Sequence, residues 1–209
     1  MEDILDVYAR PRDAKRPVVC LDETTKQLVK EITQPMAAEP GRPARVDYEY
    51  ERNGVGTLFM MCAPLEGWRE VSVRKRKTAQ DYAQCLKELA DVHYRDAEKI
   101  VLVQDNLSTH SQTSLYATFE PEEARRIRNR FEFHYTPKHA SWLNIAECEL
   151  SALSRQCLQR RIEDMDELQT EIATWIRERN EETVRINWRF TTSDARIKLK
   201  TLYPSIERG

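Results

Sequence analysis

VVCLDETTK, residues 18–26, is an apolar stretch that stops at two acids, Asp22 and Glu23. A carboxylate that follows a buried strand must stay near water or find a cation, because an isolated buried charge is costly. The same pattern returns in IVLVQDNLSTH, residues 100–110, where an apolar run leads through a glutamine into Asp105. We therefore expect two buried strands that each end beside an acid with a shared purpose.

The composition indicates one soluble domain. The chain has 209 residues, 40% of them hydrophobic, which is enough for one sizeable core. The N-terminus is charged and then interrupted by proline, so it is not a signal peptide, and no apolar run approaches the length of a membrane span. The five cysteines are odd in number and contain no C-x-x-C pair, which is typical of reduced thiols and predicts a cytoplasmic location.

The overall charge does not indicate nucleic-acid binding. The chain carries 33 basic and 35 acidic residues and has a pI near 6.2, whereas nucleic-acid-binding domains are usually strongly basic. The basic residues are nevertheless clustered, and each cluster alone is most simply a solvated face or a helix end. Together with a catalytic site, they would gain weight as positive surfaces. The clusters are residues 74–77, 125–130, 159–161 and 185–200.

The rest of the chain alternates between strand and helix patterns. Thr78, followed by Asp81, forms a capping box ahead of an amphipathic run. Pro121 suits the first turn of a helix, and Ser141 is the expected N-cap of a long helix. In the first part of the chain we expect a helix over 1–9, strands over 18–21 and around 46–50, a turn in NGVG at 53–56, and strands over 56–64 and 68–73 joined by a turn at 65–67. In the second part we expect a helix from 78, a strand over 100–103, helical pieces over 112–130, a strand over 131–135, and helices from 141, over 165–179 and over 194–202.

These elements predict a mixed α/β sheet with helices packed on it. If the strands before Asp22 and Asp105 are parallel neighbours, both acids lie at the same edge of the sheet, where open α/β sheets bind their ligands. Two such carboxylates repel each other, and a divalent cation would neutralise them. Carboxylate oxygens without a nearby histidine or cysteine set favour Mg²⁺ or Mn²⁺ over zinc.

A third acid is expected from the helix that begins in SWLNIAECEL, residues 141–150. Helical periodicity places Glu147 and Glu149 on opposite flanks of the apolar stripe, at similar angles, and does not choose between them. Asn144 precedes Glu147 by three residues and so neighbours it on the helix surface, where it could orient a metal-binding carboxylate. This spacing favours Glu147.

Three blocks of the sequence resemble those of a known family. VVCLDET (18–24), VLVQDNLSTH (101–110) and HYTPKHASWLNIAECE (134–149) are similar to the Asp, Asp-Asn and Asn-x-x-Glu blocks of mariner-superfamily DDE transposases, in the bacterial insertion-sequence branch. The similarity continues through NGVGTLFMMCAPLEGWREV (53–71) and INWRFTTSDARIKLKTLYP (186–204), and so covers nearly the whole chain from about residue 16.

The resemblance implies a ribonuclease-H-like mixed sheet flanked by helices, with Asp22, Asp105 and Glu147 as catalytic ligands of two Mg²⁺ or Mn²⁺ ions. It implies cleavage of DNA at the ends of an insertion sequence and transfer of the 3′-hydroxyl to target DNA. The expected division is an N-terminal helix and linker over 1–16, the catalytic domain over 17–180 and a C-terminal helical tail over 181–209. Residues expected to orient the ligands are Glu23, Asn106 and Asn144, and those expected to contact DNA are Arg74, Lys75, Arg76, Lys77, Lys138, His139, Trp142 and Arg155.

Two departures from the family pattern shape the expected partners. The second and third acids are 42 positions apart (147 minus 105), a wider spacing than many members have, and the segment 115–130 can absorb the difference. Such transposases also carry N-terminal helix-turn-helix domains, whereas this chain starts almost at the first acid block. We therefore expect a separate helix-turn-helix polypeptide or a truncated copy, and a homodimer on DNA, with no membrane partner.

Other interpretations remain beside this one. A ribonuclease-H-type nuclease would hydrolyse DNA without strand transfer, and a non-catalytic remnant would bind DNA without cutting it. His110 alone is more simply a loop residue than an acid or base, and Trp142 suits the core as well as a DNA contact. For the chain alone we expect weak, salt-sensitive and sequence-nonspecific DNA binding.

Overall fold

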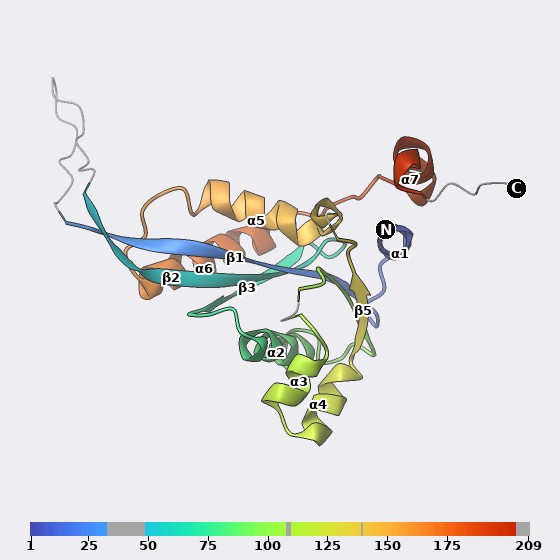
Figure 1. Cartoon of the computed structure of the whole chain (residues 1–209), viewed down its shortest axis with the longest axis horizontal. Coiled ribbons are helices and arrows are strands. Elements are labelled where there is room, and N and C mark those ends of the chain that lie inside the picture. The colour runs from blue at the N-terminus through green and yellow to red at the C-terminus, as the bar shows by residue number, and fades with distance from the viewer. Residues whose placement is uncertain (33–48, 108–109, 139, 204–209) are drawn as a thin grey trace, which may run out of the picture.

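The computed structural model describes residues 1–32, 49–107, 110–138 and 140–203. At its centre is a five-stranded sheet in the order β3-β2-β1-β4-β5 (Figure 1). The strands β1, β4 and β5 are parallel, while β2 and β3 run antiparallel to their neighbours. The predicted mixed sheet is therefore confirmed. The strands are β1 (Val18–Glu31), β2 (Tyr50–Ala63), β3 (Trp68–Arg74), β4 (Ile100–Gln104) and β5 (Phe131–Tyr135).

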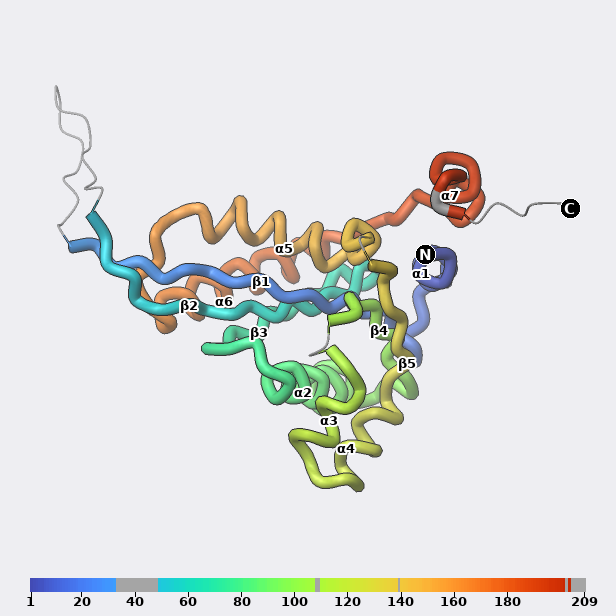
Figure 2. The backbone as a smooth tube through the Cα atoms, in the orientation of Figure 1, coloured from blue at the N-terminus to red at the C-terminus, as the bar shows by residue number. Residues whose placement is uncertain are grey.

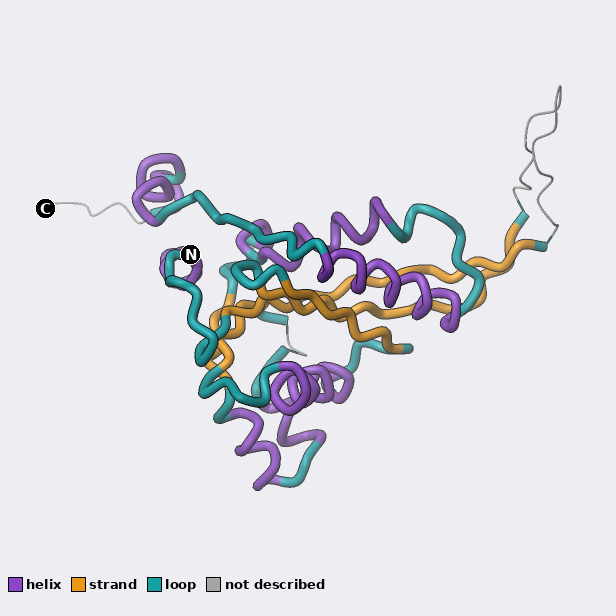
Figure 3. Tube along the Cα trace, turned by 180° about the vertical axis from the view of Figure 1, so that it is seen from behind, coloured by secondary structure: helices purple, strands orange, loops and turns teal. Residues whose placement is uncertain are grey.

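Helices cover both faces of the sheet (Figures 2 and 3). On one face lie α1 (Glu2–Tyr8), α5 (Ile145–Gln156), α6 (Met165–Glu181) and α7 (Thr192–Lys198). On the other face lie α2 (Ala79–Glu88), the π-helical turn η1 (Leu89–His93), α3 (Thr113–Thr118) and α4 (Pro121–Arg128). Within the described residues, no helix is long and apolar enough to cross a membrane.

The central strands divide their side chains between two cores. Cys20 faces the core under α5 and α6, whereas Val19 and Leu21 face the core under α2. A strand buried on both faces needs apolar side chains at consecutive positions, because successive residues point to opposite faces. This requirement explains why residues 18–21 and 100–103 are continuous apolar runs.

The first acid stands within a strand and not after it. The sequence predicts that the strand ends at Leu21, but β1 continues to Glu31 as half of a long hairpin with β2. Its parallel partner β4 pairs only with residues 18–20. Asp22 therefore lies where the neighbouring strand has stopped, and its side chain keeps an open flank although the backbone continues in the hairpin.

Two turns were expected around β2, and only one exists. The turn predicted at 53–56 is wrong, since β2 runs through these residues. Gly54 has φ +97°, and the β1 register shifts between Gln27 and Val29, which is a β-bulge. The turn at 65–67 is confirmed, and Gly67 has φ +70°. Most of the strand expected around 46–50 lies outside the described residues, and only its last residue is seen, at the start of β2.

The helix starts were predicted in part. The capping box is present, with the Thr78 hydroxyl accepting from the Asp81 amide, and Pro121 lies in the first turn of α4. The expected cap at Ser141 is wrong. Residues 141–143 form a short 3₁₀ turn, η2 (Ser141–Leu143), and α5 starts after Asn144, whose side chain caps it. The last predicted helix is α7 followed by a second 3₁₀ turn, η3 (Lys200–Leu202).

Candidate active site

Asp22 lies on a pocket of about 340 Å³ between β1 and α5. One carboxylate oxygen accepts from the Glu23 amide at 2.8 Å, and the other accepts from Asn144 Nδ2 at 3.2 Å. The pocket lining consists of Asp22, Glu23, Thr24, Glu147, Leu150 and Ser151. The structure thus brings the first predicted acid and the favoured third acid to one cavity.

The predicted second acid also reaches this region. Cys20 and Val103 are the last paired residues of β1 and β4, and Asp22 and Asp105 each lie two positions beyond them. Burial raises the pKa of Asp22, the hydrogen bond from the Glu23 amide opposes the rise, and the negative charges of Asp105, Glu23 and Glu147 add to it, giving a pKa of about 7. The carboxylates therefore share one electrostatic environment.

Asn144 joins the strand and the helix that carry the acids. Its fully buried side chain donates to the Leu21 carbonyl at 2.8 Å and to Asp22, while its Oδ1 accepts from the Ala146 amide at 3.2 Å. Its backbone carbonyl accepts from the Glu147 amide at 3.1 Å. The expectation that its side chain orients the Glu147 carboxylate is wrong in detail, since the side chain binds Asp22 and only the backbone holds the turn of Glu147.

His110 connects Asp105, the second predicted acid, to Glu23. Its Nδ1 contacts Asp105 Oδ1, and its Nε2 lies 2.8 Å from Glu23 Oε2, at ion-pair distance but not aligned as a hydrogen bond. The side chain is only 1% exposed. Burial opposes protonation, but the Asp105 hydrogen bond and the Glu23 contact outweigh it and raise the pKa of His110 to about 9. A buried imidazolium therefore holds both carboxylates.

His110 itself is held from inside the core. The Tyr82 ring stacks on the imidazole with a centroid separation of 4.8 Å, and its hydroxyl donates to Gln104 Oε1 at 2.8 Å. Gln104 in turn donates to the His110 carbonyl at 2.9 Å. No sequence pattern indicates this role, because Glu23 and His110 are far apart in the chain and the parallel pairing of β1 and β4 brings them together.

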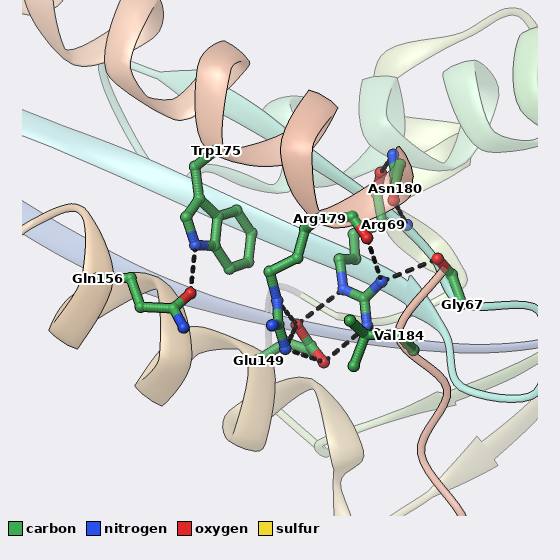
Figure 4. Close-up of polar contacts among 8 residues, drawn as sticks. All are labelled: Gly67, Arg69, Glu149, Gln156, Trp175, Arg179, Asn180 and Val184. Carbon is green, nitrogen blue, oxygen red and sulfur yellow. Dashed lines mark hydrogen bonds and ion pairs between the residues drawn. The ribbon is translucent and has the colours of Figure 1, made fainter. Parts of the chain in front are cut away.

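Glu149, the alternative third acid, belongs to a structural ion-pair network (Figure 4). Arg69 binds both of its oxygens, at 2.8 and 3.0 Å, and Arg179 approaches at 3.4 Å. The Arg69 and Glu149 side chains are 1% and 2% exposed. Arg69 also donates to the carbonyls of Gly67 and Val184. Because Glu149 is fully engaged on the far side of the helix, the geometry favours Glu147 as the acid of the pocket.

The comparison with family models identifies the fold's family. The model described as DDE superfamily endonuclease matches residues 17–169. The chain belongs to this family. The matched region contains β1, β4 and α5 and all three predicted acids. A search of curated proteins finds no match.

Solved structures support the same assignment of the fold. The Mos1 strand transfer complex matches with a TM-score of 0.56 and 17% identity over 88% of this chain and 58% of that chain. The Mos1 mariner paired end complex with Mn matches with a TM-score of 0.54 and 17% identity over 88% of this chain and 55% of that chain. The chain thus spans somewhat over half the length of these relatives. The ribonuclease-H-like fold is confirmed, whereas the bacterial insertion-sequence branch stays a prediction.

The residues expected to contact DNA divide into free and engaged groups. Asn106 and Lys138 line a second pocket of about 370 Å³ beside Asp105, together with Leu107, Thr136, Pro137 and Ser141. Lys77 contacts Glu23 at 3.1 Å, and Arg74 is paired with Glu88. His139 lies outside the described residues. Across the described residues, no ion-pair partner is found for the exposed cations Lys75, Arg76, Lys138 and Arg155.

Trp142 is partly packed and partly exposed, and its contact with DNA stays a prediction. Its side chain is 44% exposed, yet it stacks on Trp188 at 6.3 Å and meets Phe190 edge-on at 5.7 Å. One part of the indole is thus supported by the C-terminal segment, and the rest is accessible. An exposed, supported aromatic ring of this kind suits contact with a sugar or base.

The acids of this DDE-family chain have the right chemistry for a divalent cation but are not drawn together around one. In the part of the chain that the structure describes, no three His, Cys, Asp or Glu side chains form a ready metal cluster. The Asp105 carboxylate is turned to His110, and that of Asp22 to Asn144. The donors are carboxylate oxygens, and burial together with the charges of the neighbouring acids raises the pKa of Asp22. Such a set fits Mg²⁺ or Mn²⁺.

Proposed function

We propose that the chain is the catalytic domain of a transposase that cuts DNA phosphodiesters and joins the released 3′-hydroxyl to target DNA, with Asp22, Asp105 and Glu147 as its catalytic residues. The observation that carries the proposal is the position of the acids in the fold. Asp22 and Glu147 line one pocket between β1 and α5, and Asp105 follows β4 at the position that matches Asp22 on β1. Membership of the DDE superfamily endonuclease family supports the same reaction class.

Asp22, Asp105 and Glu147 would hold two Mg²⁺ or Mn²⁺ ions, which would supply Lewis-acid activation of the attacking oxygen and stabilisation of the leaving oxygen. The chain's own residues shape this site. Asn144 holds Asp22 against the start of α5, and His110 holds one oxygen of Asp105. Each oxygen of Asp22 accepts one hydrogen bond, from the Glu23 amide or from Asn144, and so keeps a lone pair for a cation.

The substrate would be bound mainly through its phosphates. Lys75 and Arg76 directly follow β3, Lys77 touches Glu23 at the pocket, and Lys138 lines the pocket beside Asp105. These cations flank the acids from two sides, which suits a DNA strand that passes the site. Arg155 and the exposed part of Trp142 would extend this contact along α5.

The biological setting is inferred from the same resemblance. We infer that the DNA partners are the element ends of an insertion sequence and its target, and that the chain acts as a homodimer on DNA in the cytoplasm. A separate helix-turn-helix polypeptide would supply recognition of the element ends. The structural relatives are transposase complexes such as the Mos1 strand transfer complex, which supports the choice of partner class.

The direct test is a nicking and strand-joining assay on linear duplex with a pre-cut 3′-hydroxyl in Mg²⁺ or Mn²⁺. Each of Asp22→Asn, Asp105→Asn and Glu147→Gln should lower both products by about a hundredfold or more, since even ligand-supporting residues typically cost 10–100-fold. Glu178→Gln is the matched control, because Glu178 is an exposed carboxylate on α6. Nicking without joining would favour a ribonuclease-H-type nuclease, and unchanged activity in all three variants would refute the proposal.

A further inference from the structure

Tyr8, at the end of α1, lies outside the region that matches the family model but touches the start of α5. Its hydroxyl donates to the Leu143 carbonyl at 2.7 Å and accepts from the Ile145 amide at 3.3 Å. It also lies 3.4 Å from Cys20 Sγ. The side chain is 8% exposed, so these are interior contacts. A single phenol thus satisfies two backbone groups in the protein interior.

The two backbone groups flank Asn144. Leu143 ends the turn before it, and Ile145 is the first residue of α5. Asn144 binds Asp22 through its side chain and holds the Glu147 amide through its carbonyl. The position of the Tyr8 hydroxyl is therefore coupled, through one residue, to two of the three proposed catalytic acids.

The helix that carries Tyr8 is itself fixed by the other end of the chain. Arg196 of α7 forms a bidentate ion pair with Glu2 at 2.7 and 2.8 Å, and Thr192 donates to Asp6 at 2.8 Å. The rings of Tyr8 and Trp188 lie 5.1 Å apart. Figure 1 shows α1 beside α7. We call α1 and α7 together the terminal clasp.

We propose that Tyr8 is a positioning residue of the active site, through which the terminal clasp holds Asn144 and the first turn of α5, and so Asp22 and Glu147, in place. This inference rests on the proposed function for its catalytic meaning. The structural role of Tyr8 does not rest on the proposed function, because the contacts of Tyr8 with residues 143 and 145 exist whatever reaction the site performs.

Tyr8→Phe removes the hydroxyl and keeps the ring that packs on Trp188, so the variant retains the apolar contacts of α1. It leaves a buried carbonyl and a buried amide without this partner, which loosens the start of α5. The amides of Ala146 and Glu147, which bond to Asn144, report on that loosening directly. Tyr94→Phe is the matched control, since Tyr94 donates at 3.1 Å to Glu66, a residue outside the acid pocket.

The experiment measures hydrogen exchange on the metal-free full chain and Mn²⁺ binding by calorimetry. In Tyr8→Phe, the amides of Ala146 and Glu147 should exchange at least about fivefold faster, since one lost hydrogen bond alone accounts for a change of that size and this variant loses two. Mn²⁺ affinity should fall by a similar factor, and nicking should need more Mn²⁺ without losing its maximal rate at saturation. Tyr94→Phe should change the thermal midpoint comparably and leave all three quantities unchanged.

Unchanged exchange at Ala146 and Glu147 in Tyr8→Phe would overturn the proposal. So would faster exchange with unaltered Mn²⁺ affinity, because Tyr8 would then stabilise the fold without positioning the acids. Glu147→Gln separates a failure of the underlying function. If that variant binds Mn²⁺ as the wild type does, the proposed site is wrong, and the role of Tyr8 in it falls too, whatever the exchange rates are.

Discussion

At the scale of single residues, the site depends on how charges are compensated in a buried environment. His110 contacts both Asp105 and Glu23, and Lys77 forms an ion pair with the other oxygen of Glu23, Oε1. The two acids at strand positions 22 and 105 could be predicted from sequence, since each follows an apolar run. The histidine could not, because its function depends on a partner 87 positions away (110 minus 23).

The metal-free protein should lose stability as pH rises. His110 has a pKa of about 9 against an ordinary 6.5, so its contribution is complete below pH 6.5 and is lost as pH rises through 9. Asp22 has a pKa of about 7 against an ordinary 3.8, so the folded state again binds more protons, and stability falls as pH rises toward 7. Urea unfolding in EDTA from pH 5 to 9.5 measures the slope.

His110→Gln should flatten the part of this profile between pH 6.5 and 9, and Asp22→Asn the part between about pH 4 and 7. The two variants thus divide the profile between the two groups. A wild-type profile that rises across pH 6 to 9 would contradict the assigned charges.

Replacing Glu149 by Gln should lower the free energy of unfolding strongly, whereas the same replacement at Glu147 should hardly change it. Glu149→Gln leaves a buried Arg69 guanidinium without its counter-ion and should cost about 3–5 kcal/mol in the free energy of unfolding. Glu147→Gln, in the open pocket, should change it by less than about 1 kcal/mol. Urea denaturation of both variants measures the two changes. Equal losses in the free energy of unfolding would mean that Glu147 has a structural role as well.

At the scale of elements, local signals were predictable and tertiary ones were not. The capping box of α2 lies within four residues and was found, whereas the start of α5 moved from Ser141 to Asn144 because Asn144 binds Leu21 and Asp22 on a distant strand. The length of β1 was missed because its second half is polar and is held by pairing with β2, which sequence periodicity does not show.

The turn between β2 and β3 should be intolerant of a side chain. Gly67 has φ +70°, and a Cβ there would lie 2.7 Å from the backbone of Thr183. Gly54 also has a positive φ, of +97°, but a Cβ there meets nothing within 4 Å. Gly54→Ala should therefore lower the free energy of unfolding by about 1–2 kcal/mol, because of backbone strain alone. Gly67→Ala should lower it by at least about 1 kcal/mol more, because the new Cβ also meets Thr183.

Chemical denaturation of the two glycine variants under one condition gives this difference. It also tests the approach of the segment after α6 to the β2–β3 turn, which places Val184 on Arg69. Equal costs at the two positions would show that Thr183 does not pack against Gly67 in solution.

At the scale of the whole molecule, the positions of the charged residues say more about function than the net charge does. The net charge is −2, yet Lys138, for which no ion-pair partner is found among the described residues, lines the pocket beside Asp105, while many other basic residues are held in ion pairs. The clusters at 125–130 and 159–161 largely serve structure. Arg126, for instance, binds Glu123 and Asp91. Composition alone could not separate these two uses of basic residues.

DNA binding by the chain alone should be weak and should fall with salt, because it depends on phosphate contacts. Lys138→Ala should lower affinity for unrelated duplexes alike and reduce the salt slope by about 1. Lys15→Ala is the control, since Lys15 precedes β1 at the opposite end of the parallel strands from Asp22. Filter binding over a salt series measures both, and tight site-specific binding at physiological salt would contradict the expectation.

Anomalous diffraction from crystals soaked in Mn²⁺ would show whether Asp22, Asp105 and Glu147 form one divalent-cation site. We expect manganese within coordinating distance of the Asp22 carboxylate and of at least one of the other two, with Asp105 turned away from His110 to reach it. Manganese bound elsewhere in the molecule, with these three side chains unchanged at saturating concentration, would contradict this expectation.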